Sequence, residues 1–216
     1  SENPNRARRH QRWRTCSGYS RWPRPSCLSA GIIHRTRCGQ LDTLILPLDF
    51  PAIALDILHM NIETITRAIN KHALTVVGAL HPESDKTIIL LGPNEPIFWG
   101  HFTNSKEYID GRRDPLDRWS MRVIGDLASE FSARAVFPFC GPPYHPFIDW
   151  ALRSNSVWQS PVQLLVHHSS GLFVSFRGAL IFEESMELPA AKQSPCKTCA
   201  EKPCLSACPA AALTSD

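Results

Sequence analysis

The sequence predicts an α+β fold, a mixed α/β sandwich domain followed by a small cysteine-rich module at the carboxyl end. The chain has 216 residues, 43% of them hydrophobic, which suffices to bury the core of one ordinary domain with an appendage. Beyond residue 60, apolar residues recur with helical spacing in some segments and as short β-branched runs in others. Four cysteines then lie close together near the end. We therefore expect three parts, residues 1–59, 60–188 and 189–216.

The first part differs from the rest in composition. Residues 1–39 contain nine Arg, one acidic residue and no Lys, whereas residues 60–216 contain 14 Lys and Arg against 16 Asp and Glu. An Arg-rich arm is typical of nucleic-acid or membrane-surface binding, or of an organellar transit peptide. We favour another interpretation, in which this leader is largely disordered or not native and Met60 is the true start, because it lacks apolar periodicity. The sequence therefore predicts no nucleic-acid partner.

Two observations predict a cytoplasmic protein with no membrane partner. The most apolar stretch, residues 44–60, contains Asp49, Pro51 and Asp56, and it is too short and too charged to cross a bilayer. The sequence does not open with the charged head, apolar region and cleavage site of a secretory signal peptide.

The second part begins with a predicted helix over residues 61–72. Its apolar residues recur at helical spacing, and Asn61 is placed to cap its first turn. Residues 73–80 and 87–92 are short apolar runs bounded by polar, Pro-containing segments, which predicts two strands.

Further along, residues 115–132 have an apolar side and follow Asp114, which predicts a second helix with an aspartate cap. The remaining predicted elements are a strand at 133–139, a helix at 146–153, strands at 162–166 and 172–182, the last broken near Gly178, and a linker at 189–195.

The third part carries the strongest chemical signal in the chain. Cys196, Cys199, Cys204 and Cys208 have the spacing C-x2-C-x4-C-x3-C and are followed by Pro209. Thiolates separated by two or three residues on a tightly turning loop suit the corners of a 4Fe-4S cluster. The middle spacer is two residues longer than in common bacterial ferredoxins. We expect Pro209 to lead into a short helix over residues 210–213.

Four cysteines at this spacing have two alternative roles, a zinc site or a pair of disulfides. A structural zinc site takes four Cys or His ligands, but its usual form is two pairs separated by a longer spacer. A pair of disulfides needs an oxidising compartment, for which the sequence has no export signal. Cluster binding is the favoured prediction, and a zinc-binding structural or interaction module without redox activity is the alternative.

The cysteine run, preceded by the segment FVSFRGALI at residues 173–181, resembles the epoxyqueuosine reductase and reductive dehalogenase group. The chain is most similar to the smaller ferredoxin-like proteins related to that group. The resemblance implies an iron–sulfur protein in electron transfer, with a redox protein as its partner and, if it is an enzyme, an iron–sulfur oxidoreductase activity.

In those reductases the preceding domain binds a cobalamin. The region that corresponds to their Gly-Lys-Asn segment reads Ser160-Pro161-Val162-Gln163 here, which argues against a cobalamin. In two-cluster ferredoxins the fourth cysteine of such a run ligates the other cluster. Either all four cysteines serve one cluster, or Cys208 serves a second one whose remaining ligands lie outside this sequence. We favour the second possibility.

Other candidates carry weaker signals. Cys140 lies five residues before His145, which suits a nucleophile or a distant ligand, although a buried structural cysteine is the more common case. Of the adjacent pair His167 and His168, at most one can point inward from a strand. The charged residues 110–117 fit a solvated loop at least as well as a carboxylate pair. We identify no Walker A, G-x-G-x-x-G or G-x-S-x-G motif, and we assign no catalytic residue.

Overall fold

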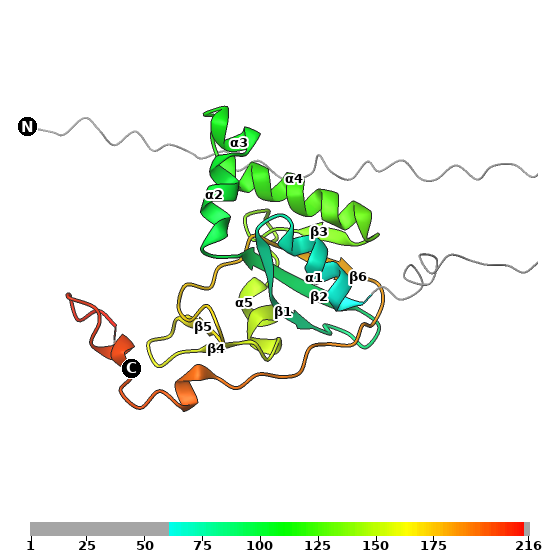
Figure 1. The fold of residues 1–216 in the computed structure, drawn as a ribbon. Helices are drawn as coiled ribbons and strands as arrows, with labels where there is room; N and C mark the ends of the chain where they lie inside the picture. Colours follow the sequence, from blue (N-terminus) through cyan, green and yellow to red (C-terminus); the bar gives the residue numbers. More distant parts are fainter. Residues whose placement is uncertain (1–60, 214–216) are drawn as a thin grey trace, which may run out of the picture. The chain divides into compact units, whose positions relative to one another are not determined.

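The structure, a computed structural model, describes residues 61–213 (Figure 1). The predictions made for residues 1–59 therefore lie outside the described residues. The elements that follow from these residues are, in chain order, α1 (Ile62–Asn70), β1 (Leu74–Leu80), β2 (Thr87–Pro93), α2 (Ile97–Thr103), α3 (Lys106–Ile109), α4 (Pro115–Glu130), β3 (Arg134–Val136), α5 (Phe147–Arg153), β4 (Val157–Gln159), β5 (Leu165–His167), β6 (Gly178–Phe182), and the 3-10 turns η3 (Pro195–Lys197) and η4 (Pro203–Leu205).

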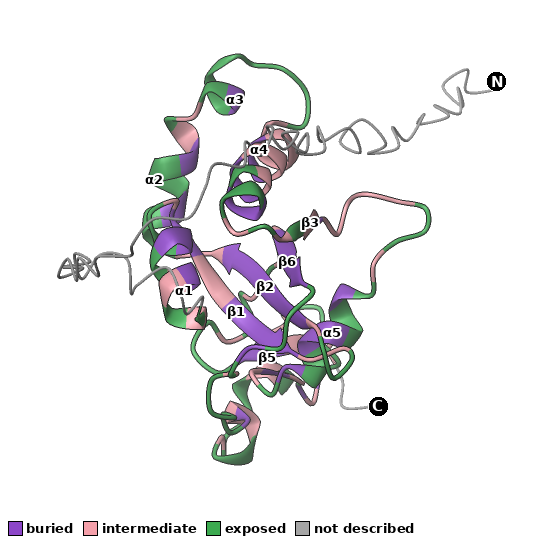
Figure 2. Cartoon of the chain, turned by 90° about the vertical axis from the view of Figure 1, so that its right-hand side faces the viewer, coloured by how far each residue is buried: buried purple, intermediate pink, exposed green. Residues whose placement is uncertain are grey.

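The central sheet has four antiparallel strands in the order β1-β2-β6-β3. Strands β2 and β6 lie in its middle and are buried along most of their length (Figure 2). Strands β4 and β5 form a separate antiparallel hairpin in which Val157 pairs with His167. The described part of the chain is therefore α+β, as the sequence predicts.

Helices cover both faces of this sheet, because its central strands are apolar on both sides. Ile89 and Leu180 are register partners that belong to one core, together with buried residues of α1 and α4 such as Trp119. Ile88 and Ile181, each one position along, belong to a second core with α5. This alternation follows from the two-residue period of a strand.

Helix α1 confirms its predicted cap, whereas α4 does not. The Asn61 side chain accepts a hydrogen bond from the Thr64 N–H at 2.9 Å. Asp114 adopts a left-handed conformation with φ 54° and makes no capping hydrogen bond from its side chain. The aspartate cap predicted for α4 is wrong, and Pro115 begins the helix, since its fixed φ suits the first turn.

The strands of the second half are shorter than predicted. Strand β3 covers only the middle of the predicted segment 133–139, and β5 starts at Leu165 rather than at residue 162. Of the predicted strand 172–182, only β6 from Gly178 onward pairs. The preceding segment crosses β2 so closely that a Cβ on Gly92 would lie 2.5 Å from the Ser175 carbonyl oxygen. Apart from the Arg177 N–H, which donates to the Leu91 carbonyl at 2.7 Å, the segment packs on the sheet through Val174 and Phe176.

Besides the two 3-10 turns, the sequence prediction lacks three elements. These are helix α2, which follows Pro96 and includes Gly100, helix α3 and strand β4. In residues 61–213 no helix combines the length and the apolar character needed to cross a membrane.

Candidate metal centre

The four cysteines predicted as ligands lie in two similar turns. In each of the 3-10 turns η3 and η4 the first residue is a proline and the second a cysteine, Cys196 in η3 and Cys204 in η4. Proline suits the first position because its φ is already fixed and the turn requires no N–H there. The second cysteine of each pair, Cys199 or Cys208, follows shortly after the turn.

Matching hydroxyl contacts hold the two turns. The hydroxyl of Thr198 donates to the Pro195 carbonyl at 3.3 Å, and that of Ser206 donates to the Pro203 carbonyl at the same distance. Ahead of η3, the Ser194 hydroxyl accepts from the Cys196 N–H at 3.3 Å. The cysteine run is thus a short internal repeat of Pro-Cys turns.

A backbone turn follows Cys208, in which the Ala211 N–H donates to the Cys208 carbonyl at 3.0 Å. Hydrogen bonds from the backbone of Ala212 and, more weakly, Ala210 and Leu213 lower the pKa of the Cys208 thiol. Ala211 has φ 49°, a left-handed conformation that interrupts a right-handed helix. The helix predicted over residues 210–213 is therefore wrong: this segment is a turn.

All four thiols are free and half-exposed. No residue between 195 and 213 is buried, so this segment has no core of its own. Within residues 61–213, no three His, Cys, Asp or Glu side chains lie close enough together to hold a metal ion. The structure therefore places the predicted ligands in one short segment but does not bring their sulfur atoms into one site.

The segment before η3 is attached to the folded domain. The N–H of Lys192 donates to the Asn155 carbonyl at 3.1 Å, immediately before β4. The next residue of the domain, Ser156, accepts from the His168 N–H at 3.2 Å. Ser194 is buried. These contacts fix the point at which residues 189–213, the cysteine segment, leave residues 61–188, the sheet domain.

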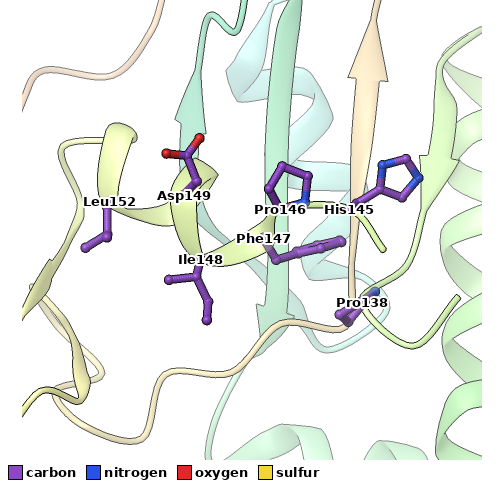
Figure 3. A pocket seen from close by; sticks show the side chains of 7 residues that line it. All are labelled: Pro138, His145, Pro146, Phe147, Ile148, Asp149 and Leu152. Atoms are coloured by element: carbon purple, nitrogen blue, oxygen red, sulfur yellow. The ribbon is translucent and has the colours of Figure 1, made fainter. Parts of the chain in front are cut away.

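Cys140 and His145 lie on either side of a proline-rich turn, and Cys140 is half-exposed. The His145 ring stacks on Trp150 with centroids 5.6 Å apart, and burial lowers its pKa. His145 lines a hollow of about 590 Å³, whose mostly apolar lining includes Phe147 and Ile148. Figure 3 shows that the His145 ring and the Asp149 carboxylate do not converge, so this hollow holds no acid–base pair.

Of the histidine pair, His167 is buried and His168 is exposed, as strand alternation predicts. The Nδ1 atom of His167 accepts from the N–H groups of Ser169 at 3.4 Å and Ser170 at 3.1 Å, so its proton is on Nε2. Nε2 is buried without a hydrogen-bond partner of good geometry among the described residues. Burial and His168 lower the pKa of His167 to about 4, against a small opposite effect of the Val77 backbone.

The charged residues 110–117 stabilise the fold through ion pairs. Arg118 makes a bidentate ion pair with Asp110 at 2.7 Å for both bonds, and this pairing lowers the pKa of Asp110 to about 2. Asp117 lies 3.9 Å from Arg177, and partial burial raises its pKa. The two aspartates have different partners and form no carboxylate pair. The buried pair Glu107–Arg122 close by was not predicted, because its partners lie 15 residues apart on two helices.

Comparison with protein-family models, with curated proteins and with solved structures finds no match for this chain. The resemblance to the epoxyqueuosine reductase and reductive dehalogenase group therefore rests on the cysteine run and the segment before it, and the comparisons do not support it.

Proposed function

We propose that this chain is an iron–sulfur protein that binds a 4Fe-4S cluster through Cys196, Cys199, Cys204 and Cys208 and acts in electron transfer. The observation that carries the proposal is the repeated Pro-Cys turn, which presents four free thiols within one short segment. Soft thiolate ligands on closely spaced turns are the usual protein ligands of such clusters.

The residues fit the group in two further respects. The backbone hydrogen bonds to Cys208 from Ala212, Ala210 and Leu213 favour its thiolate, and hydrogen bonds to sulfur tune the potential of a cluster. Residues 195–213 also include no buried side chain that would have to be displaced. Because metal binding couples to the folding of the segment that carries the ligands, we expect the two turns to close together on assembly.

When bound, the cluster supplies one-electron redox chemistry. The residues of this chain then have separate tasks. The four cysteines would lose their protons and hold the iron, and the backbone of the residues after Cys208 would offset negative charge on its sulfur. Lys192 and Ser194 fix the segment to the sheet domain. No residue is assigned a catalytic role.

Anaerobic purification of the full chain tests the proposal. We expect a brown protein that contains iron and acid-labile sulfide and whose visible absorption bleaches on reduction with dithionite. A colourless protein with one zinc per chain would instead support the structural module that holds its cysteines on zinc. A protein with neither metal after anaerobic reconstitution with iron and sulfide contradicts the proposal.

A further inference from the structure

The cysteine segment carries a positive charge that the domain before it lacks. Residues 61–188 contain 11 Lys and Arg against 14 Asp and Glu, whereas residues 189–213 contain three Lys and one Glu. The three lysines, Lys192, Lys197 and Lys202, are all exposed. Among residues 61–213, no carboxylate lies within ion-pairing distance of any of them.

The same segment leaves apolar surface uncovered. Leu205 in η4 is 38% exposed, and the alanines 207 and 210–212 are exposed. The four thiols themselves are half-exposed. A redox centre held there would lie at the protein surface, with its ligands flanked by lysines and by small apolar side chains. Such a surface permits the close approach that electron transfer between proteins requires, and short-lived complexes of this kind use small interfaces.

From these observations we propose that residues 192–208 are the docking surface for a redox protein with an acidic face, guided by Lys192, Lys197 and Lys202. The inference rests on the proposed function. Charge complementarity mainly raises the rate of encounter, and it does so most at low ionic strength. The negative balance of residues 61–188 disfavours encounter of an acidic partner with the sheet domain, so within residues 61–213 the difference in charge favours the cysteine segment.

The lysines have an alternative role, which the test must separate from docking. Positive charges near a cluster offset its negative charge and thereby alter its reduction potential. A potential effect changes the rate with every electron donor, whatever the donor's charge. A docking effect changes the rate only with charged partners and disappears at high salt.

The experiment uses the full-length cluster-loaded protein and stopped-flow reduction by an acidic flavodoxin, with a small uncharged reductant as reference. The test variant is Lys197→Glu with Lys202→Glu. The matched control is Lys71→Glu with Lys106→Glu, which makes the same charge change at two exposed positions of the sheet domain. Iron per chain and the midpoint potential are measured for all three proteins.

We expect the test variant to react with the flavodoxin at least about 10-fold more slowly than the control at low ionic strength, and equally fast at high ionic strength. Its rate with the uncharged reductant and its midpoint potential should stay unchanged. Equal slowing in the control, or slowing with both reductants together with a changed potential, overturns the docking proposal while leaving the cluster assignment intact. A wild-type protein that binds no cluster overturns both.

Discussion

Arg122 donates two hydrogen bonds to the carboxylate of Glu107, at 2.7 and 3.0 Å, and so fastens the one-turn helix α3 to α4. Glu107 is buried, and the hydrogen bonds from Arg122 hold its pKa below the usual value against the opposing effect of burial. A helix of four residues is not stable alone. The position of α3 therefore depends on this pair and on the neighbouring pair Arg118–Asp110.

We expect Glu107→Gln to lower the free energy of unfolding by about 1–2 kcal/mol, because the charge-assisted bonds are lost while the Arg122 side chain can still reach water. The side chains of Asp149 and Arg153 pair at 3.5 Å but are mostly exposed, so Asp149→Asn should cost less than about 0.5 kcal/mol. Urea unfolding of both variants at pH 7 measures the contrast. Equal effects would show that the pair does not hold α3.

His167 makes the fold sensitive to acid. Its pKa is about 4 in the folded protein and 6.5 in the unfolded chain, so the unfolded chain binds the proton more tightly. Above pH about 6.5 His167 does not lower the free energy of unfolding, and its effect grows as the pH falls towards 4. The difference in pKa corresponds to roughly 3 kcal/mol when the effect is complete.

Unfolding by urea at several pH values between 7.5 and 4.5 tests this expectation. His167→Gln should flatten the dependence relative to the native chain, even if it lowers stability at pH 7 by removing the acceptor for Ser169 and Ser170. Asp110 does not interfere, since its contribution is lost only as the pH falls from about 4 towards 2. Parallel curves for the two proteins would refute the role of His167.

The sequence predicted α1, β1 and β2 well, because the residues that specify each of these elements lie within or next to the element itself. The Asn61 cap and the apolar spacing of α1 are such signals. Helices α2 and α3 could not be predicted in this way, because distant residues stabilise them: Phe98 and Phe102 pack on Trp119 of α4, with ring centroids 5.4 and 6.1 Å apart. A sequence window of one helix does not contain these contacts.

The candidate site likewise combines features that the local sequence predicts with features that it does not. The spacing of the cysteines identified the segment, and the structure adds the repeated turns, which the two Pro-Cys pairs could have indicated. The left-handed Ala211 could not be predicted, because an Ala-rich run after proline favours a helix by propensity. The Lys192–Asn155 contact is between backbone groups 37 residues apart in sequence and leaves no side-chain signal.

The proposed cluster predicts different results for cysteines inside and outside the segment. Cys199→Ala should lose nearly all iron, because a cluster with one corner unligated is readily lost. Cys140→Ala should retain the iron content of the native chain, because Cys140 lies in the turn before α5 rather than in the segment. Iron and sulfide analysis after anaerobic reconstitution compares them. Unchanged iron in Cys199→Ala contradicts the ligand assignment, and loss of iron in Cys140→Ala would identify a further ligand.

Cys208→Ala separates the two arrangements of the cluster. If all four cysteines serve one cluster, this variant should lose iron as completely as Cys199→Ala does. If Cys208 belongs to a second cluster, the native chain should bind iron substoichiometrically and the variant should retain what the native chain holds. We expect the first result, because the proposed site uses all four thiols, and iron analysis of the two variants side by side measures it. Iron retained by Cys208→Ala, with substoichiometric iron in the native chain, would reverse this expectation.

Two glycines should respond in opposite ways to alanine. A Cβ added to Gly78 in β1 would lie 2.5 Å from the hydroxyl oxygen and 2.7 Å from the Cβ of Ser154, which follows α5 and is buried. Ser154 is held there by its hydrogen bond to the Ala151 carbonyl at 2.7 Å, so it cannot turn away without losing that bond. We expect Gly78→Ala to lower the free energy of unfolding by about 1–3 kcal/mol through overpacking between β1 and α5.

Gly125 is the matched control. It lies in the interior of α4, and a Cβ there would meet no atom within 4 Å. Gly125→Ala should therefore raise the free energy of unfolding by about 0.5–1 kcal/mol, because alanine loses less conformational freedom in a helix than glycine does. Thermal and urea unfolding of the two variants measure the difference. If Gly78→Ala proved as stable as the native chain, α5 would not pack on β1 as closely as the Ser154 contact requires, and the attachment of the cysteine segment through Asn155, the next residue, would have to be reconsidered.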